Sequence, residues 1–183
     1  MLHVLINADD FGYSKTVNMA IVDCFKNKTI NRTTIMVNMP CADEALTLSK
    51  ENNFFDCVGL HINLTEGKAL SEECAFSELC DENGFFKGTF HIPFKSRIYL
   101  SKKVRHAIFC EVEAQIKKYL EMGFTLMHAD SHNYTHAYFS VYTPVRKLLK
   151  KYGFKSVRIS RNIAPEKFSV PFRIYKTLFN NII

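Results

Sequence analysis

Hydrophobic and polar residues alternate along this chain in blocks that predict strands and helices in turn. Short apolar runs rich in β-branched residues predict buried strands over residues 2–8, 33–38, 57–64, 125–129 and 155–159. Apolar residues at helical spacing predict helices over residues 14–25, 42–52, 104–122 and 141–151. Strands that alternate with helices indicate a parallel sheet with covered faces.

The ends of two predicted helices carry recognisable signals. Ser14 is the residue type that caps a helix N-terminus, and Gly123 is the type that ends one. Residues 66–98 show no clear periodicity, and we interpret them as a long insertion near a functional site.

The composition is that of a globular protein. The chain has 183 residues, of which 47% are hydrophobic and 23% charged, so we expect one domain over residues 1–183. No apolar run reaches the ~20 residues that cross a bilayer. The N-terminus lacks the features of a signal peptide, so we expect a cytoplasmic protein.

Net charge bears on the expected binding partners, and cysteine content bears on the expected redox state. The net charge of +6 is compatible with nucleic-acid binding, but no groove-reading or stacking motif accompanies it, so we expect no nucleic-acid partner. The six cysteines form no CxxC motif, and we expect them to be reduced and mostly buried.

Potential metal ligands gather after three predicted strands. The residues concerned are Asp9, Asp10, His61, His128, Asp130, His132 and His136. Because functional residues of parallel α/β proteins lie at the carboxyl ends of strands, we expect these side chains to converge.

The acid pair raises a geometric problem. Adjacent residues of an extended strand point to opposite faces, so Asp9 and Asp10 cannot both ligate one metal unless the chain turns. A turn at Phe11-Gly12 would bring one of them round. The two acids could therefore differ in role, with one carboxylate bound to a metal and the other free to act as a base. The structural alternative is that Asp10 caps a helix.

His61 lies inside an apolar strand and needs a polar partner if it is buried. It is either a metal ligand or a core histidine bonded to a backbone carbonyl. Asn63 shares its face and is placed to orient a ligand or substrate.

The segment 127–136 is the strongest signal. His128, Asp130 and His132 alternate and face one way in an extended chain, whereas His132 and His136 meet only if the chain turns helical. Mixed histidine and carboxylate ligands suit Zn²⁺, Mn²⁺, Fe²⁺ or Co²⁺, and Mg²⁺ with more oxygen ligands. The remaining polar residues would then orient the ligands.

Three ordered motifs resemble the YdjC/ChbG family of carbohydrate deacetylases. They are residues 7–12 (NADDFG), residues 59–65 (GLHINLT), and residues 130–132 (DSH) followed by His136. The resemblance spans residues 1 to about 160. It implies a deformed (β/α) barrel of parallel strands with outer helices, one divalent metal (Mg²⁺ in this family), and removal of acetyl groups from N-acetylated sugars or oligosaccharides.

The resemblance also assigns roles to residues. The implied metal ligands are Asp10, His61 and His132. The implied catalytic set is Asp9 as the base, with His128, His136 and Arg158 around it. We further expect Asn63 and Asp130 to contact substrate.

The chain departs from the family pattern at its end. Family members continue with a segment whose Cys-His-Pro-like motif supplies another histidine, whereas no histidine follows His136 here. We therefore expect a barrel incomplete at the C-terminus, slow turnover with only His128 or His136 as general acid, and exposed strand edges that favour a homodimer. The alternatives are another metal hydrolase, such as a phosphoesterase, and a non-catalytic metal- or sugar-binding remnant.

Overall fold

Five parallel strands form one sheet in the computed structural model of the chain. The structure describes residues 4–89, 93–158, 170, 173, 174 and 177. The strands are β1 (Asn7–Phe11), β2 (Arg32–Ile35), β3 (Val58–Ile62), β4 (His128–Ser131) and β5 (Ser156–Val157). Their order in the sheet is their order in the chain, and every neighbouring pair is parallel.

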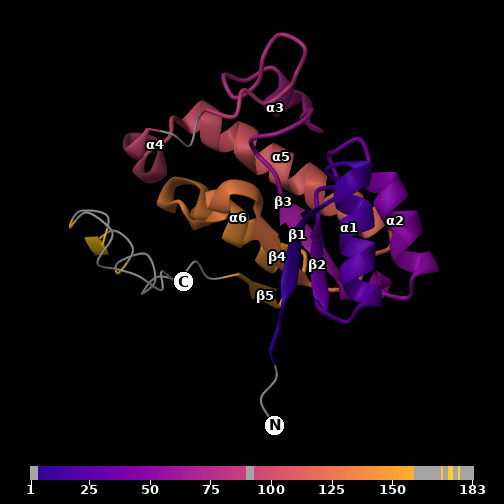
Figure 1. Ribbon diagram of the computed structural model, residues 1–183. Coiled ribbons are helices and arrows are strands. Elements are labelled where there is room, and N and C mark those ends of the chain that lie inside the picture. Colours follow the sequence, from indigo (N-terminus) through magenta and orange to yellow (C-terminus); the bar gives the residue numbers. More distant parts are fainter. Residues whose placement is uncertain (1–3, 90–92, 159–169, 171–172, 175–176, 178–183) are drawn as a thin grey trace.

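Helices connect the strands, as the sequence periodicity predicts. The helices are α1 (Lys15–Lys26), α2 (Ala42–Glu51), α3 (Glu72–Ala75), α4 (Phe94–Ile98), α5 (Lys102–Glu121) and α6 (Phe139–Lys151), with short 3₁₀ segments η1 (Phe55–Cys57) and η2 (His132–Ala137). Ser14 caps α1 as predicted. Figure 1 shows α1 and α2 beside β1 and β2, and α5 and α6 beside β3 to β5.

The strand order identifies the type of α/β fold. A parallel sheet with strands in chain order and right-handed crossovers places all connecting helices on one face, as barrels do. A doubly wound sheet would reverse its order in the middle. The α/β class is therefore confirmed. Within the described residues β1 and β5 are the sheet edges and do not pair with each other. The prediction that the barrel is incomplete at its C-terminus concerns mainly residues that lie outside the described ranges.

The strand boundaries differ from the prediction, β2 ending at Ile35 instead of residue 38, and the differences at β1 and β4 concern the site. The ladder of β1 begins at Asn7, which pairs with Arg32, and outside the ladder the N–H groups of Asn31 and Arg32 donate to the Ile6 carbonyl at 3.1 and 3.2 Å. The ladder of β4 pairs Ile62 with Ser131, so the strand extends through Asp130 instead of ending at residue 129. Both strands thus contain the acids that the sequence placed after them.

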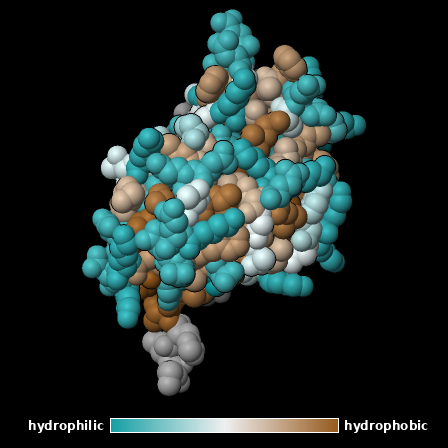
Figure 2. Space-filling model, turned by 90° about the vertical axis from the view of Figure 1, so that its right-hand side faces the viewer, coloured by the Kyte–Doolittle hydropathy of each residue, from teal (hydrophilic) through white to brown (hydrophobic). Residues whose placement is uncertain are grey.

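The N-terminal apolar run is exposed rather than buried. Val4, Leu5 and Ile6 are 57%, 64% and 49% exposed. Figure 2 shows one face of the molecule, on which hydrophilic residues predominate and hydrophobic residues lie among them. Among the described residues, no helix combines the length and apolarity needed to span a membrane.

The insertion is structured where the sequence shows no periodicity. It contains α3 and α4 and two isolated antiparallel bridges, Lys68 with Phe85 and Cys80 with Phe86. The buried carboxylate of Glu111 on α5 accepts hydrogen bonds from the backbone N–H groups of Leu70 and Ser71, both at 2.9 Å. A buried carboxylate needs such donors, so this contact fixes the insertion to α5. The six cysteines are free as predicted, but only Cys74 and Cys80 are buried and the other four are partly exposed, so the expectation that most are buried is wrong.

Candidate metal centre and active site

A β-bulge in β1 resolves the geometry of the acid pair. Between Ala8 and Phe11 the strand has one residue more than its partner between Thr33 and Ile35. Asp10 adopts a left-handed conformation there, with φ of 67°. A bulge re-aims side chains, so Asp9 and Asp10 both bring a carboxylate oxygen within 4.8 Å of a ring nitrogen of His61. The turn that the sequence suggested at Phe11-Gly12 follows directly, closed by a hydrogen bond of 3.0 Å from the Tyr13 N–H to the Asp10 carbonyl.

Asp10, His61 and His132 converge from three separate elements. Asp10 Oδ1 lies 3.1 Å from His61 Nε2 and 2.8 Å from His132 Nδ1. One donor atom of each residue lies within 4.8 Å of the other two. The two imidazoles meet edge to face with ring centroids 5.7 Å apart. The contacts with His132 and His61 hold the pKa of Asp10 well below its usual range.

Asp130 supports His61 from the other side of the ring. The two residues are register partners on β3 and β4, and Asp130 Oδ1 lies 2.5 Å from His61 Nδ1. Thr34 Oγ1 lies 3.2 Å from the same nitrogen. Burial alone would lower the pKa of His61, but the carboxylates of Asp10 and Asp130 outweigh it and raise the pKa to about 9. Asp130 is 1% exposed and lies behind His61, whereas the sequence analysis expected it to contact substrate.

His132 reaches Asp10 because the chain reverses sharply after β4. Asn133 and Tyr134 both have left-handed backbones, with φ of 54° and 52°. Such conformations are costly for residues with a Cβ and are found where the surroundings enforce them. The Asn133 side chain donates to Thr65 Oγ1 at 3.1 Å, which holds this turn against the end of β3.

Asp9 forms its ion pair with Arg158, whereas Asp10 contacts the two histidines. The Arg158 guanidinium donates to both carboxylate oxygens of Asp9, each at 2.8 Å. It also lies 3.2 Å from Asp130 Oδ2. Asn7 donates to Asp9 Oδ1 at 2.7 Å. Paired carboxylates raise the pKa of Arg158, the Asp9 hydrogen bond contributing most. Such a bidentate pair fixes a carboxylate in both position and orientation.

His128 and His136 lie apart from the ligand cluster. His128 begins β4, and its Nδ1 is 2.8 Å from Ser156 Oγ on β5. His136 is 1% exposed, and both of its ring nitrogens contact protein groups. The predicted helical turn that would bring His132 and His136 together is interrupted by the left-handed residues between them. The described geometry therefore brings neither histidine to Asp10.

Asn63 is occupied by the loop that follows β3. Its side-chain amide donates to Asn38 Oδ1 and Glu66 O, and its Oδ1 accepts from the N–H groups of Thr65 and Glu66. Gln115 pairs with its backbone N–H and C=O. Because its polar groups are satisfied in this way, Asn63 stabilises the loop after β3. This geometry does not present it to substrate, whereas the sequence analysis expected such a contact.

The sequence reasoning missed two supporting residues, Asn7 and Thr34. Asn7 stands two positions before Asp9, a spacing that places both on one face of a strand. Thr34 is one of two adjacent buried threonines of β2, with Thr33. Both residues are polar residues of predicted strands, but only the fold shows that they contact Asp9 and His61.

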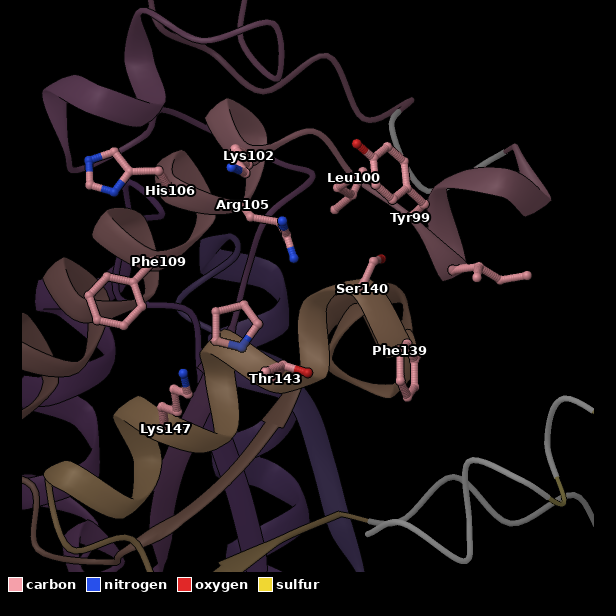
Figure 3. A pocket seen from close by; sticks show the side chains of 12 residues that line it. Tyr99, Leu100, Lys102, Arg105, His106, Phe109, Phe139, Ser140, Thr143 and Lys147 are labelled. Carbon is pink, nitrogen blue, oxygen red and sulfur yellow. The ribbon is translucent and has the colours of Figure 1, made fainter.

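A cavity of about 370 Å³ lies elsewhere, between α4, α5 and α6 (Figure 3). Its polar lining is mostly basic and hydroxylic, and its walls carry aromatic rings; it includes Lys102, Arg105, His106, Lys147, Tyr99 and Phe139. None of the described residues that line this cavity carries a carboxylate. It therefore offers no mixed carboxylate and histidine donor set of the kind found around Asp10.

Comparison with known proteins points to one family. A model of the YdjC-like protein family matches residues 3–179. The chain is 37% identical over 156 residues to a carbohydrate deacetylase of Thermoanaerobacter pseudethanolicus, covering 84% of this chain and 59% of that protein. It is 33% identical over 171 residues to a carbohydrate deacetylase of Clostridium beijerinckii, covering 91% and 64%.

A solved structure agrees with the fold. The crystal structure of a "putative cellobiose-phosphate cleavage protein" from Enterococcus faecalis V583 superposes with a TM-score of 0.75 at 25% identity. The match covers 97% of this chain and 64% of that one. The chain thus spans about three fifths of the length of the proteins that it matches.

Proposed function

Because this chain belongs to the YdjC-like protein family, we propose that it removes acetyl groups from N-acetylated sugars with the help of one divalent cation. Its relatives named carbohydrate deacetylase support the reaction class. The single observation that carries the proposal is the convergence of Asp10, His61 and His132 from three elements far apart in sequence. One carboxylate and two imidazoles form a donor set that divalent metals bind.

The histidines are prepared for this role. His61 Nε2 is buried and makes no hydrogen bond of acceptable geometry, although Asp10 Oδ1 is 3.1 Å away. Its other nitrogen is held by Asp130, which fixes the ring with Nε2 toward Asp10. In metal sites, a carboxylate commonly accepts a hydrogen bond from the second ring nitrogen of a metal-binding histidine and so fixes the orientation of the ring. We therefore assign Asp10, His61 and His132 as the residues that would hold the cation.

The charges favour one cation over two. Asp9, His61 and Asp130 form a second group of potential ligands. The Arg158 guanidinium contacts both acids of that group, at 2.8 Å and 3.2 Å. Its permanent positive charge already compensates them, and a second cation would be repelled there. A two-metal phosphoesterase site, which needs bridging carboxylates, is therefore disfavoured.

Asp9 is the residue that we assign as general base. A bound divalent cation would polarise the acetamide carbonyl and lower the pKa of a water molecule. Asp9 stands beside the ligand Asp10 without belonging to its cluster, and its side chain is 37% exposed. Arg158 and Asn7 fix its orientation, so it is placed to accept a proton from attacking water.

Aromatic side chains border the site. Tyr13 stacks on His132 with ring centroids 6.4 Å apart, and it is 37% exposed. Tyr134 is 52% exposed and follows His132 by two residues. Flat apolar faces beside polar groups suit a sugar ring, which has an apolar face and a hydroxylated edge. We infer that these tyrosines border the substrate.

Acetate release from N,N′-diacetylchitobiose tests the proposal. The chain is stripped with a chelator and reloaded separately with Mg²⁺, Mn²⁺ or Zn²⁺, because the donor set suits transition metals as well as Mg²⁺. We expect release that requires a metal, that is lost in Asp9→Asn, and that persists in Asp23→Asn, an exposed acid on α1. No release with any metal would contradict the proposed function for this chain.

A further inference from the structure

His136 is a buried polar group that the proposed chemistry does not use. Its side chain lies between β4 and the end of β5, where it is 1% exposed. Nδ1 is 2.5 Å from Ser131 Oγ, and Nε2 is 2.7 Å from the backbone carbonyl of Arg158. A histidine with both nitrogens occupied by protein is poorly placed to deliver a proton to substrate.

The surrounding donors and acceptors define which nitrogen carries the proton. Ser131 Oγ already accepts the backbone N–H of His136 at 3.0 Å, so its hydroxyl proton is free to point at Nδ1. The Arg158 carbonyl only accepts, so Nε2 must donate to it. Both contacts are satisfied by the neutral imidazole with the proton on Nε2. Burial, which lowers the pKa of His136, favours the same form.

Arg158 needs such an anchor because β5 is short. The strand has only two residues, and Arg158 follows it directly. Its N–H donates to Ala129 O at 3.0 Å, and His136 Nε2 binds its C=O. The arginine side chain is long and flexible, so its bidentate contact with Asp9 depends on where its backbone is held.

From this chain of contacts we infer that His136 is a positioning residue: its Nε2–H fixes the backbone of Arg158, and Arg158 in turn orients Asp9. The role replaces that of general acid expected from the sequence. Its catalytic consequence rests on the proposed function, since Asp9 matters for turnover only if it is the base. The structural link from His136 through Arg158 to Asp9 does not depend on that function.

Two variants that differ by one methylene test the link. In His136→Asn the amide ends near the position of Nδ1, so the contact with Ser131 is preserved but the Arg158 carbonyl is out of reach. In His136→Gln the amide extends to the position of Nε2 and restores a donor to that carbonyl. A role in packing or polarity alone would not rank these two variants in this way.

Nuclear magnetic resonance detects the structural link between His136 and Arg158 without a measurement of turnover. We expect the imidazole nitrogens of His136 in the unmodified chain to show the neutral form protonated on Nε2. The guanidinium proton signals of Arg158 are assigned by their absence in Arg158→Lys. We expect these protons to exchange slowly with water, and their signals to be resolved, in the unmodified chain and in His136→Gln. We expect the signals to be lost in His136→Asn. A proton on Nδ1, or an unchanged Arg158 signal in His136→Asn, would overturn the inference. The first readout needs no variant, so it decides even if His136→Asn fails to fold.

Acetate release supplies the functional readout. Misplacing a catalytic group by about 1 Å can cost about 100-fold in rate, so we expect kcat of His136→Asn to fall about 10- to 100-fold. KM and metal content should be unchanged, and His136→Gln should restore most of kcat. His136→Asn should have no further effect once Arg158 is alanine, and an additive loss there would contradict the inference. If the unmodified chain releases no acetate, the proposed function fails while the resonance result still decides the role of His136.

Discussion

Asp9 and Asp10 are adjacent in sequence, yet they belong to two regions of the site with different chemistry. Asp10 faces two imidazoles, whose nitrogens exchange a proton for a metal ion. Asp9 faces a guanidinium, which keeps its protons and cannot ligate a metal. The partners of each acid, and not its own side chain, therefore separate the proposed metal-binding region from the region that orients the proposed base.

Asp130 joins the two regions. One of its oxygens holds His61 Nδ1, and the other lies 3.2 Å from the Arg158 guanidinium. It is buried, and its pKa is lowered because the contacts with His61 and Arg158 outweigh the effect of burial. A single buried carboxylate thus contacts both His61, a proposed metal ligand, and Arg158, which holds the proposed base Asp9.

The largest effect is expected from removal of an imidazole in the metal-binding region. His61→Ala and His132→Ala should each abolish stoichiometric binding of the divalent cation, because a three-residue site that loses one ligand retains little affinity. Metal analysis after gel filtration measures this. His128→Ala is the matched control, since His128 pairs with Ser156 and should leave binding intact. One tightly held equivalent in both His61→Ala and His132→Ala would refute the ligand assignment.

A smaller effect is expected from the residue that joins the regions. Asp130→Asn keeps the shape of the side chain but removes the negative charge behind His61. Loss of such a supporting group typically costs about 10- to 100-fold in metal affinity. Competition titration with a chelating dye measures the change. If the affinity of Asp130→Asn equals that of the unmodified chain, Asp130 does not support the ligand.

The smallest effect concerns the metal-free chain and its pH dependence. His61 has a pKa of about 9 against an ordinary value of 6.5, so its protonated form stabilises the fold. That contribution is fully present below about pH 6.5 and is lost as the pH rises toward 9. We expect the free energy of unfolding, measured with urea, to decline over this range. The decline should be absent in His61→Asn, and an equal decline there would assign the effect to other groups.

Much of the fold follows from local sequence signals. Helices α1, α2, α5 and α6 appear where the periodicity of apolar residues places them, because that pattern reflects burial of one face. Strands β1 and β4 were misplaced by a few residues. Each contains acids of the site, and these acids interrupt the apolar pattern that marks a strand.

The site was predictable in membership but less so in roles. Residue types after three strands indicated a convergent cluster, and the family resemblance singled out Asp10, His61 and His132, which the structure brings together. The bulge at Asp10 has no local sequence signature, because it depends on register with β2. His132 and His136 were expected to meet only in a helical turn, and the left-handed conformations of Asn133 and Tyr134 interrupt such a turn.

The division of labour between the two acids is tested most directly by the metal content of Asp10→Asn and Asp9→Asn. The two variants make the same chemical change at adjacent positions, so each controls for the other. Asp10→Asn should lose the cation, because an amide oxygen is a weaker ligand than a carboxylate. Asp9→Asn should retain one equivalent and lose turnover, since only the base is removed. Equal loss of metal from both variants would contradict the separation of the two regions.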